Sequence, residues 1–559
     1  MVLYRRFHLV NRNGQRVRAI DVYSGVGGWS LGLKMAGIEV VDSYEWHAPA
    51  NETNFRNNGH HANLVDVRTL ELQHLPQDID IVVGSPPCTQ FSLSNRGGSG
   101  DFEDGLKDIA KFLEIVEYLK PKYWAMENVP RVIKILKSEL STGGLLERYK
   151  NLGCDIEYVD MSEFGLPQRR RRCIVGNINF ELLRSYRAQL RPILLGDIVS
   201  SLRNPPFIDP IYGITVNEVH DHGKEDVLNA EEVRLNKAAK TLHPVYNTMP
   251  FPDPLDKTVR TITATCTRVS RESVVIQDPA TYRLRRLTLR ERATAQGFPI
   301  SFQFYGSSFG QKLQMIGNAV PPLFSFFVGQ ALQNVQPENL LSAKQAIARF
   351  NAPNTLPPET PNERSGSKYP AKRRFRMSIP SLHLKSGVRF DLTNQFDGDL
   401  VQWEVSFTFG TSKEFRKFPL ENLDNLRLKQ YIDKKTRVMV DAILSKSMAQ
   451  LESFNAENVQ RVWCHRGPSE THPFRVVDLL DETAIAISSL LTNTSFNGEM
   501  AMSYIHEIAV KISQASDLSF AKLFRNSSLI TTGLLVSHAA NSRILNDQRL
   551  VKSVRAVPT

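Results

Sequence analysis

Cysteine is scarce in this chain: five stand among 559 residues, at positions 88, 154, 173, 266 and 464, and none is arranged as Cys-x-x-Cys. An odd number of scattered cysteines argues against a disulfide framework and a structural zinc site, and it is typical of a reducing compartment. The sequence therefore predicts a cytoplasmic protein without a bound metal.

Long apolar runs are also missing. Met1 to Val17 is basic and polar, and the longest apolar stretch, near Leu323 to Val328, is far shorter than a bilayer-spanning helix requires. We therefore expect a soluble protein with no membrane partner. No repeat at solenoid spacing is found either, which argues against an array of stacked units.

What the chain does have is positive charge and enough length for several cores. Its 69 Lys and Arg exceed its 58 Asp and Glu, which gives a formal charge of +11. This balance favours a polyanionic partner, with nucleic acid ahead of a membrane surface. A chain of this length is expected to divide into two or three domains.

Short apolar runs alternate with helical patterns in the first third of the chain. Strands are predicted at Arg18–Tyr23, Ile38–Glu45, Leu64–Asp66, Ile79–Gly84, Tyr123–Val129, Ile156–Met161 and Arg172–Gly176, and helices at Trp29–Ala36 and Ile109–Leu119. Such alternation with short connections predicts an α/β fold, a doubly wound and mainly parallel sheet of the Rossmann-like kind.

A glycine turn, Ser24-Gly25-Val26-Gly27-Gly28, directly follows the first predicted strand. Gly25 and Gly27 let the backbone approach a ligand closely, because neither carries a Cβ. The spacing is Gly-x-Gly-Gly rather than Gly-x-Gly-x-x-Gly, so one nucleoside fits better than a dinucleotide. This favours S-adenosylmethionine; the alternative is a tight strand–helix connection without a ligand.

Four side chains near the next strand ends complete the predicted cofactor pocket. The carboxylate of Glu45 can bind a ribose diol, as the acidic residue about twenty positions after a glycine turn does in nucleotide sites. Trp46 and Tyr23 offer aromatic faces to an adenine, and Asp66 can accept a hydrogen bond from its amine.

Cys88 follows the predicted strand through two prolines, Pro86 and Pro87. Because proline restricts its own φ and the residue before it, the cysteine stands on a stiff exit at the carboxyl edge of the sheet. A thiolate there is a strong nucleophile. The alternative is a small buried apolar side chain, the commoner state of a lone cysteine.

Six short motifs in a fixed order resemble the DNA cytosine-5 methyltransferases of bacterial restriction-modification systems. They are Asp21-Val22-Tyr23-Ser24-Gly25-Val26-Gly27-Gly28, Pro86-Pro87-Cys88, Glu127-Asn128-Val129, Gln168-Arg169-Arg170-Arg171-Arg172, Arg286-Leu287-Thr288-Leu289-Arg290-Glu291 with Gln296-Gly297-Phe298-Pro299, and Gly317-Asn318-Ala319-Val320-Pro321-Pro322. The resemblance covers about the first three-fifths of the chain and leaves the C-terminal part unassigned.

The resemblance implies a covalent mechanism on a flipped base. Cys88 would attack C6 of cytosine, Glu127 would hydrogen-bond N3 and the exocyclic amine, and Arg172, with Arg170, would contact the ring carbonyl. Asn318 would lie against the methionine end of S-adenosylmethionine. The further residues expected to contact double-stranded DNA are Gln90, Ser92 and Arg290.

Each of these residues also has an ordinary structural interpretation. Glu127 can cap the turn after its strand, the arginine run can be a solvated charged segment, and Asn318 can be turn chemistry. Two positions depart from the family pattern: Thr89 stands where glutamine usually follows the cysteine, and Met315 replaces a second glutamine. Neither position touches the expected chemistry.

The motifs predict how the chain is divided. The expected segments are a catalytic core at 18–180, a target-recognition region at 181–282, a return to the core at 283–345, a linker at 346–370 and an accessory α+β domain at 371–559. In the last segment a strand is predicted at Val401–Phe409 and helices at Arg437–Phe454, Leu479–Leu491 and Met500–Ile512.

The leading hypothesis is a monomeric DNA cytosine-5 methyltransferase of the bacterial cytosol or nucleoid, with a cognate restriction endonuclease as a candidate partner. An RNA cytosine-5 methyltransferase on the same core is the close alternative, and a non-catalytic DNA-binding protein is a third. An amino-group methyltransferase is disfavoured by Cys88 after the two prolines, and a nicotinamide dehydrogenase by the glycine spacing. A fused nuclease is disfavoured because no strand carries a carboxylate cluster ending in Glu-x-Lys.

Overall fold

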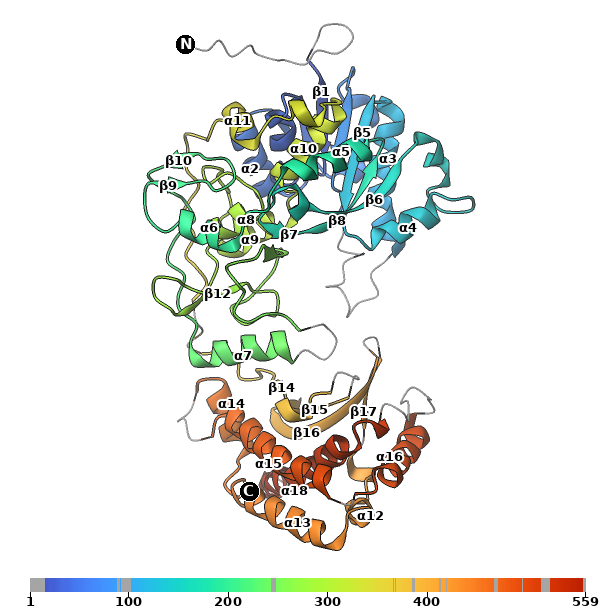
Figure 1. The fold of residues 1–559 in the computed structure, drawn as a ribbon, viewed down its shortest axis with the longest axis vertical. Helices are drawn as coiled ribbons and strands as arrows, with labels where there is room; N and C mark the ends of the chain where they lie inside the picture. Colours follow the sequence, from blue (N-terminus) through green and yellow to red (C-terminus); the bar gives the residue numbers. More distant parts are fainter. Residues whose placement is uncertain are drawn as a thin grey trace. The chain divides into compact units, whose positions relative to one another are not determined.

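The computed structural model divides the chain into two compact units (Figure 1). Unit 1 consists of Met1–Val233 and Phe251–Arg364, and unit 2 of Arg234–Pro250 and Ser365–Thr559. The structure describes residues 16–87, 91, 102–242, 248–364, 366, 368–384, 388–411, 414–418, 420–466, 471–494, 496–513 and 523–555.

Unit 1 is built on a seven-stranded sheet with the order β3-β2-β1-β4-β5-β8-β6. Its strands are β1 (Arg18–Val22), β2 (Glu39–Glu45), β3 (His61–Leu64), β4 (Ile81–Gly84), β5 (Tyr123–Asn128), β6 (Asp155–Asp160) and β8 (Arg171–Gly176). Strand β8 runs antiparallel to the other six strands, which all run in the same direction. The predicted α/β fold with a mainly parallel sheet is therefore confirmed, although β3 ends where its strand was expected to begin.

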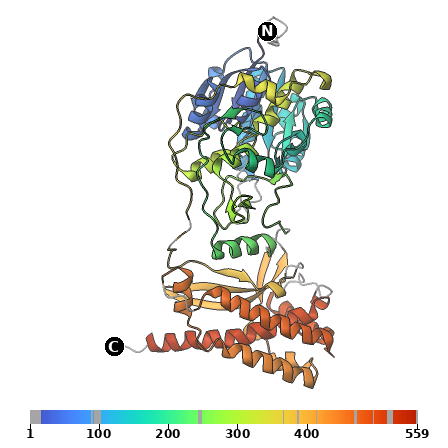
Figure 2. The ribbon, with the colours of Figure 1, turned by 60° about the vertical axis from the view of Figure 1, so that its left-hand side comes forward.

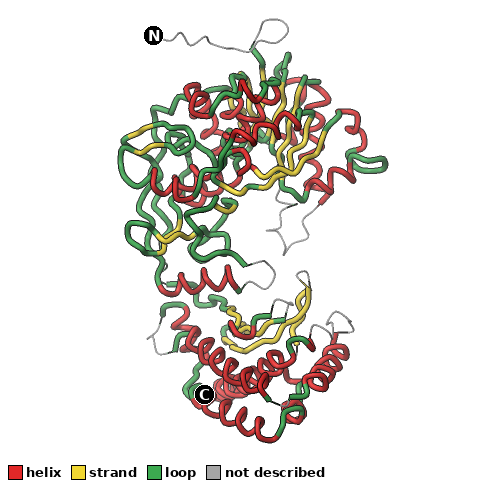
Figure 3. The backbone as a smooth tube through the Cα atoms, in the orientation of Figure 1, coloured by secondary structure: helices red, strands yellow, loops and turns green. Residues whose placement is uncertain are grey.

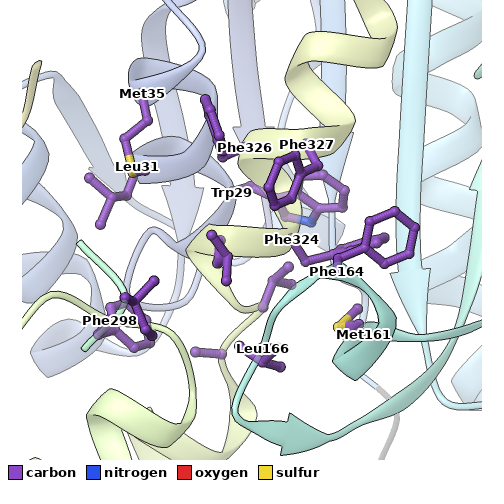
Figure 4. Packing of buried hydrophobic residues seen from close by; sticks show 14 of the residues in the cluster. Trp29, Leu31, Met35, Met161, Phe164, Leu166, Phe298, Phe324, Phe326 and Phe327 are labelled. Carbon is purple, nitrogen blue, oxygen red and sulfur yellow. The ribbon is translucent and has the colours of Figure 1, made fainter. Parts of the chain in front are cut away.

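Both faces of this sheet are covered, because successive strand residues point to opposite sides. Ala19 of β1 packs in one apolar cluster with α1 (Gly28–Met35) and α10 (Pro322–Leu332), part of which Figure 4 shows. Ile20 packs in the other cluster with α3 (Phe102–Leu119). This two-sided burial explains why the central strand β4 is a continuous apolar run.

The remaining helices of unit 1 flank these layers. They are α2 (Ala48–Asn58), α4 (Val132–Glu139), α5 (Phe180–Ser185), α6 (Leu195–Ser201), α8 (Leu289–Ala295), α9 (Phe309–Asn318) and α11 (Ala343–Ala346). The stretch Phe309–Leu332 is long and apolar enough to cross a membrane, but 94% of its most apolar window is buried inside the protein.

The segment predicted to recognise the target is rich in loops (Figure 3). Its strands are short: β9 (Phe207–Ile208) pairs with β10 (Thr215–Val216). Two others pair with strands outside the segment, β11 (Val259–Arg260) with β7 (Gln168–Arg169) and β12 (Val275–Gln277) with β13 (Leu284–Arg286). Residues 284–286, at the start of the predicted return to the core, form β13. Helix α8 begins only after a capping box, in which Thr288 and Glu291 bond each other's backbone amides.

Unit 2 has a four-stranded antiparallel sheet in the order β14-β15-β16-β17, and the helices that follow β17 are gathered on one face (Figure 2). Its strands are β14 (Arg376–Ser378), β15 (Arg389–Asp397), β16 (Leu400–Thr411) and β17 (Glu414–Phe418). Its helices are α12 (Asn425–Gln430), α13 (Lys434–Ala449), α14 (Ala456–Trp463), α15 (Pro473–Asn493), α16 (Gly498–Ser513) and α18 (Ser527–Arg555). Alternate residues of β16, Trp403 and Phe407 among them, are buried against the helices, as the polar–apolar alternation predicts.

Helix α7 (Ala230–Thr241) carries the chain from unit 1 into unit 2. Within unit 2, Arg234 binds the carboxylate of Asp478 at 2.5 and 2.8 Å and lies 4.4 Å from the ring centre of Phe474. Leu235 and Ala238 pack against the unit 2 core. The stretch expected to belong wholly to a recognition region is therefore shared between the units.

Candidate active site

The carboxyl ends of three parallel strands meet where the strand order reverses, between β1 and β4. Such a switch point leaves a crevice outside the strand ends, the usual ligand site of open α/β sheets. The glycine turn follows β1, Glu45 closes β2, and Ser85 and Pro86 follow β4. Residues that are distant in the sequence are thus gathered at a single edge.

The three glycines of the turn differ in their surroundings: Gly25 faces open space, whereas Gly27 and Gly28 are closely packed. Gly25 has φ +54°, and a Cβ there would meet nothing within 4 Å, so the position leaves room for a ligand. Gly27, at φ +82°, faces the side chain of Asn54, and a Cβ on Gly28 would lie 1.9 Å from the carbonyl oxygen of Val320. Gly25 therefore forms the floor of the cradle, while Gly28 lets α1 approach the segment before α10.

Glu45 is fixed against this turn. Its Oε2 accepts from the Gly25 amide at 2.9 Å and its Oε1 from the His47 amide at 2.8 Å. Burial raises the pKa of Glu45, and these two amide bonds oppose that rise. The neighbouring Trp46 is 65% exposed and presents an open aromatic face. A carboxylate and an indole beside an open glycine cradle suit the diol and base of a nucleoside.

Tyr23 does not offer the stacking face that its position predicts. Its side chain is buried, and its hydroxyl lies 3.2 Å from Oδ1 of Asp108 on α3. Arg68 binds both oxygens of that carboxylate, at 2.8 and 2.7 Å, and Asp104 at 2.9 Å. Tyr23 therefore belongs to a network that ties the start of α3 to the turn after β3.

Asp66 lies exposed at the start of that turn and accepts from the Arg68 amide at 3.0 Å. One oxygen thus caps the short helix that follows, while the carboxylate stays open to solvent. The turn fixes the orientation of Asp66, and its role toward a ligand amine stays a prediction.

The stretch after β4 is held from two sides. The Trp29 indole N–H donates to Oγ of Ser85 at 3.0 Å, and the Asn128 side-chain amide donates to the Pro86 carbonyl at 3.2 Å. These bonds fix the backbone on which the motif's cysteine follows. The expected nucleophile Cys88 and the expected DNA contacts Gln90 and Ser92 lie outside the described residues.

Glu127 and Arg172 form an ion pair on the neighbouring strands β5 and β8, with 2.7 Å between Oε1 and Nε. The side chains are 8% and 14% exposed, so the pair is largely withdrawn from water. A buried carboxylate held by a guanidinium costs desolvation that only close partners offset, which makes such a pair typical of functional sites.

Arg170 is placed differently from its expected role at the base. It is buried, and it donates to the carbonyls of Gly317 at 3.3 Å and Ala319 at 3.0 Å, with one nitrogen 4.0 Å from Glu127. Its guanidinium thus supports the turn that carries Asn318, whose own side chain is exposed.

Two buried glutamines strengthen the same turn, and sequence reasoning gave them no role. Gln168 lies 2.5 Å from the side chain of Gln296, which donates to the Ala319 carbonyl at 2.6 Å. Both belong to the quoted motifs, and that was the only available signal. Met315, one of the departures, is buried beside Thr53 and fills its position by packing.

Arg290 requires a correction, because it cannot contact DNA in this structure. It is 0% exposed and donates to the carbonyls of His220 at 2.9 Å and Phe302 at 2.7 Å. Burial lowers its pKa to about 10. Arg290 therefore joins α8 to the segments around His220 and Phe302 instead of meeting a phosphate.

Among the residues that the structure describes, no group of three or more His, Cys, Asp or Glu side chains is arranged to hold a metal ion. The polar groups gathered at the sheet edge are carboxylates, guanidinium groups, glycine amides and an indole. Such groups are able to hydrogen-bond a nucleoside and a planar polar ring.

Comparison with known proteins assigns the chain. The profile of the C-5 cytosine-specific DNA methylase family matches residues 17–334. Type II methyltransferase M1.HphI of Haemophilus parahaemolyticus is 27% identical over 332 residues, 56% of this chain and 86% of that protein. Type II methyltransferase M.HgiDI of Herpetosiphon aurantiacus is 28% identical over 345 residues, 57% of this chain and 94% of its own.

A solved structure, the Dnmt2 methyltransferase of S. pombe, superposes with a TM-score of 0.41 at 18% identity, covering 58% of this chain and all of that one. The sequence matches cover the glycine turn, the Glu127–Arg172 pair and the turn around Asn318. The chain therefore belongs to the C-5 cytosine-specific DNA methylase family, and it is a DNA cytosine-5-methyltransferase.

Proposed function

We propose that this enzyme methylates C5 of a cytosine within a specific duplex DNA sequence, using S-adenosylmethionine and a transient covalent bond to Cys88. The observation that carries the proposal is the buried Glu127–Arg172 pair, with Glu127 at the same carboxyl edge of the sheet as the glycine turn. S-adenosylmethionine, when bound, supplies an electrophilic methyl group. Gly25, Glu45, Trp46 and Asp66 would hold it, and Asn318 would lie at its methionine end.

Each protein group has one task in this mechanism. The Cys88 thiolate adds to C6, which makes C5 nucleophilic; after methylation the C5 proton is lost and the thiolate leaves. The Glu127 carboxyl hydrogen-bonds N3 and the exocyclic amine and so stabilises the charge that develops on the ring. Arg172 orients that carboxyl and the ring carbonyl, while Arg170 positions the turn beneath them.

Two other thiols of the chain suit this role poorly. Burial raises the pKa of the Cys173 thiol to about 12, and burial also raises the pKa of Cys154. A thiol with such a pKa is almost wholly protonated near neutral pH and is a weak nucleophile. The target cytosine must also leave the helix stack, since a side chain cannot reach C6 inside a duplex.

A duplex with 5-fluorocytosine at the target tests the mechanism. Fluorine cannot leave C5 as a proton does, so the enzyme should remain attached to DNA through Cys88, and peptide mapping should locate the bond there. Cys88→Ser should bind DNA yet form no adduct. An adduct elsewhere, or efficient methylation by Cys88→Ser, would overturn the mechanism.

The same assay separates the substrate classes. Methyl transfer to duplex DNA should exceed transfer to tRNA, and sequencing of the methylated cytosines should give one short recognition sequence. A restriction-modification role predicts that DNA carrying this modification resists a nuclease of the same specificity. Preferential methylation of tRNA would favour the RNA alternative.

A further inference from the structure

The positive charge of the chain is concentrated in unit 2. Unit 1 carries 40 Lys and Arg against 39 Asp and Glu, whereas unit 2 carries 29 against 19. Unit 2 thus accounts for +10 of the net +11, although it has the smaller share of residues. Net positive charge attracts a polyanion such as DNA, and almost all of it lies in unit 2.

Four basic residues of unit 2 are exposed at a single place, and we call them the basic patch: Lys372, Arg374, Arg461 and Arg466. The two chain segments lie side by side, because the Trp463 indole donates to the Arg374 carbonyl at 3.2 Å. The Arg466 amide also donates to the Arg461 carbonyl at 2.7 Å.

The basic patch has a rigid base and open charges. Between its members, the guanidinium of Arg373 is held 3.6 Å from the ring centre of Tyr369 and 3.5 Å from that of Trp463. Lys372 meets Asp399 at the surface. For Arg374, Arg461 and Arg466, no carboxylate of the described residues lies within ion-pair distance. Three guanidinium groups on a fixed base are suited to phosphate oxygens.

Unit 2 is also joined to the recognition region by more than one connection. The chain enters it at Arg234, returns to unit 1 at Phe251 and enters again at Ser365. A DNA segment held on unit 2 therefore remains at high effective concentration for the methylase unit.

We propose that unit 2 binds the phosphate backbone of duplex DNA through the basic patch and supplies much of the enzyme's affinity without reading sequence. The inference rests on the proposed function, because it assigns the same substrate to a second surface. Phosphate contacts position a protein on DNA, whereas base contacts specify the sequence.

The test is the salt dependence of duplex binding by the full-length triple variant Arg374→Gln/Arg461→Gln/Arg466→Gln. The affinity decreases with salt, and each lost phosphate contact makes the slope of log K against log salt shallower by about 0.9. The loss of three contacts should therefore make the slope shallower by roughly 2.7. Between 50 and 200 mM salt the affinity of the variant should then decline about 40-fold less than that of the unaltered enzyme. The effect should be equal on duplexes with and without the target sequence.

A matched control removes the same charge from another face of unit 2. Lys434→Gln/Lys435→Gln/Lys446→Gln alters three exposed lysines of α13 and should leave the slope nearly unchanged. Equal slopes for the two triple variants, or a loss confined to the target duplex, would overturn the proposal. So would a lower melting temperature of the patch variant that accounts for its weaker binding.

Methylation at saturating DNA distinguishes this inference from the proposed function. If the unaltered enzyme methylates duplex DNA but the patch variant keeps the full salt slope, only the role of unit 2 fails. If the unaltered enzyme transfers no methyl group to duplex DNA, the proposed function fails first.

Discussion

At the scale of single residues, the ion pair between Glu127 and Arg172 is the feature most directly tied to the proposed chemistry. Its geometry presents a carboxyl group, buried and oriented, at the edge where the substrate ring is expected. Glu127→Gln keeps the shape but cannot provide the same proton or charge at N3. The single-turnover methylation rate should fall about 10²- to 10⁴-fold, as measured with tritiated donor and a saturating duplex.

A neighbouring carboxylate provides the control. Glu157 on β6 is much more exposed and pairs with Arg184 at 3.0 Å, so Glu157→Gln should retain the unaltered rate. Loss of activity in both variants would indicate a general structural effect, and near-normal activity of Glu127→Gln would contradict the assigned role.

Asp21 makes the stability of unit 1 depend on pH. Burial raises its pKa from 3.8 to about 7, against two hydrogen bonds from Ser30 that lower it. The folded protein therefore binds this proton more tightly than the unfolded chain does. The stabilising contribution is complete below about pH 4 and declines as pH rises toward about 7.

Asp21→Asn should remove this pH dependence. Its side-chain oxygen can still accept from Ser30, but the residue no longer titrates. The melting temperature of the variant, followed from about pH 5 to pH 8, should fall less steeply with pH than that of the unaltered protein. Parallel curves for the two proteins would show that Asp21 is not the titrating group.

At the scale of elements, the proposed cofactor contact and the packing of α1 fall on different residues of the glycine turn. Gly25→Ala meets no atom within 4 Å but adds a side chain at φ +54°, at a cost of about 1 kcal/mol. It should fold, yet lose the thermal stabilisation that S-adenosylmethionine gives. Gly28→Ala would collide with the Val320 carbonyl and should yield little folded enzyme.

These two variants are distinguished by thermal melting with and without the cofactor, and by soluble yield. If S-adenosylmethionine raises the melting temperature of Gly25→Ala as much as that of the unaltered protein, Gly25 does not line the cofactor site. A well-folded Gly28→Ala protein would mean that α10 can shift away from α1.

Several elements were predictable because local pattern and final environment agree. The central strand β4 is a continuous apolar run, and Trp403 and Phe407 alternate with polar residues and pack into the core of unit 2. The positions of Gly25 and Glu45 at one edge also followed from strand topology. The bounds predicted for the three accessory helices agree closely with those of α13, α15 and α16.

Other features depend on contacts between distant residues and could not be predicted. Arg170 and Arg290 resemble surface arginines in the sequence, and only the fold reveals carbonyl groups around them. Helix α7 is anchored by Arg234 to Asp478, a partner 244 residues away. Local spacing carries no information about such pairs.

At the scale of the whole molecule, unit 2 should not be removable by truncation alone. A chain ending at Arg364 keeps α7 but loses the core on which Leu235 and Ala238 pack and the carboxylate that binds Arg234. We expect such a protein to aggregate or to melt at a lower temperature than the full chain. Size-exclusion chromatography and thermal melting measure both effects.

A second truncation tests the cause. Replacing Arg234–Pro250 with a short glycine-serine linker in the truncated chain should restore solubility. The replacement removes the part of α7 that has lost its packing partners in unit 2. If the simple truncation is already soluble and stable, the α7 contacts contribute little to the fold.

The shared helix α7 also determines what a protease can separate. Residues 351–364 carry neither helix nor strand and offer a natural cleavage site between unit 1 and the bulk of unit 2. A single nick there would leave the N-terminal fragment holding Arg234–Pro250, still embedded in the C-terminal fragment. The two pieces should therefore co-purify as a complementing pair and separate only in denaturant.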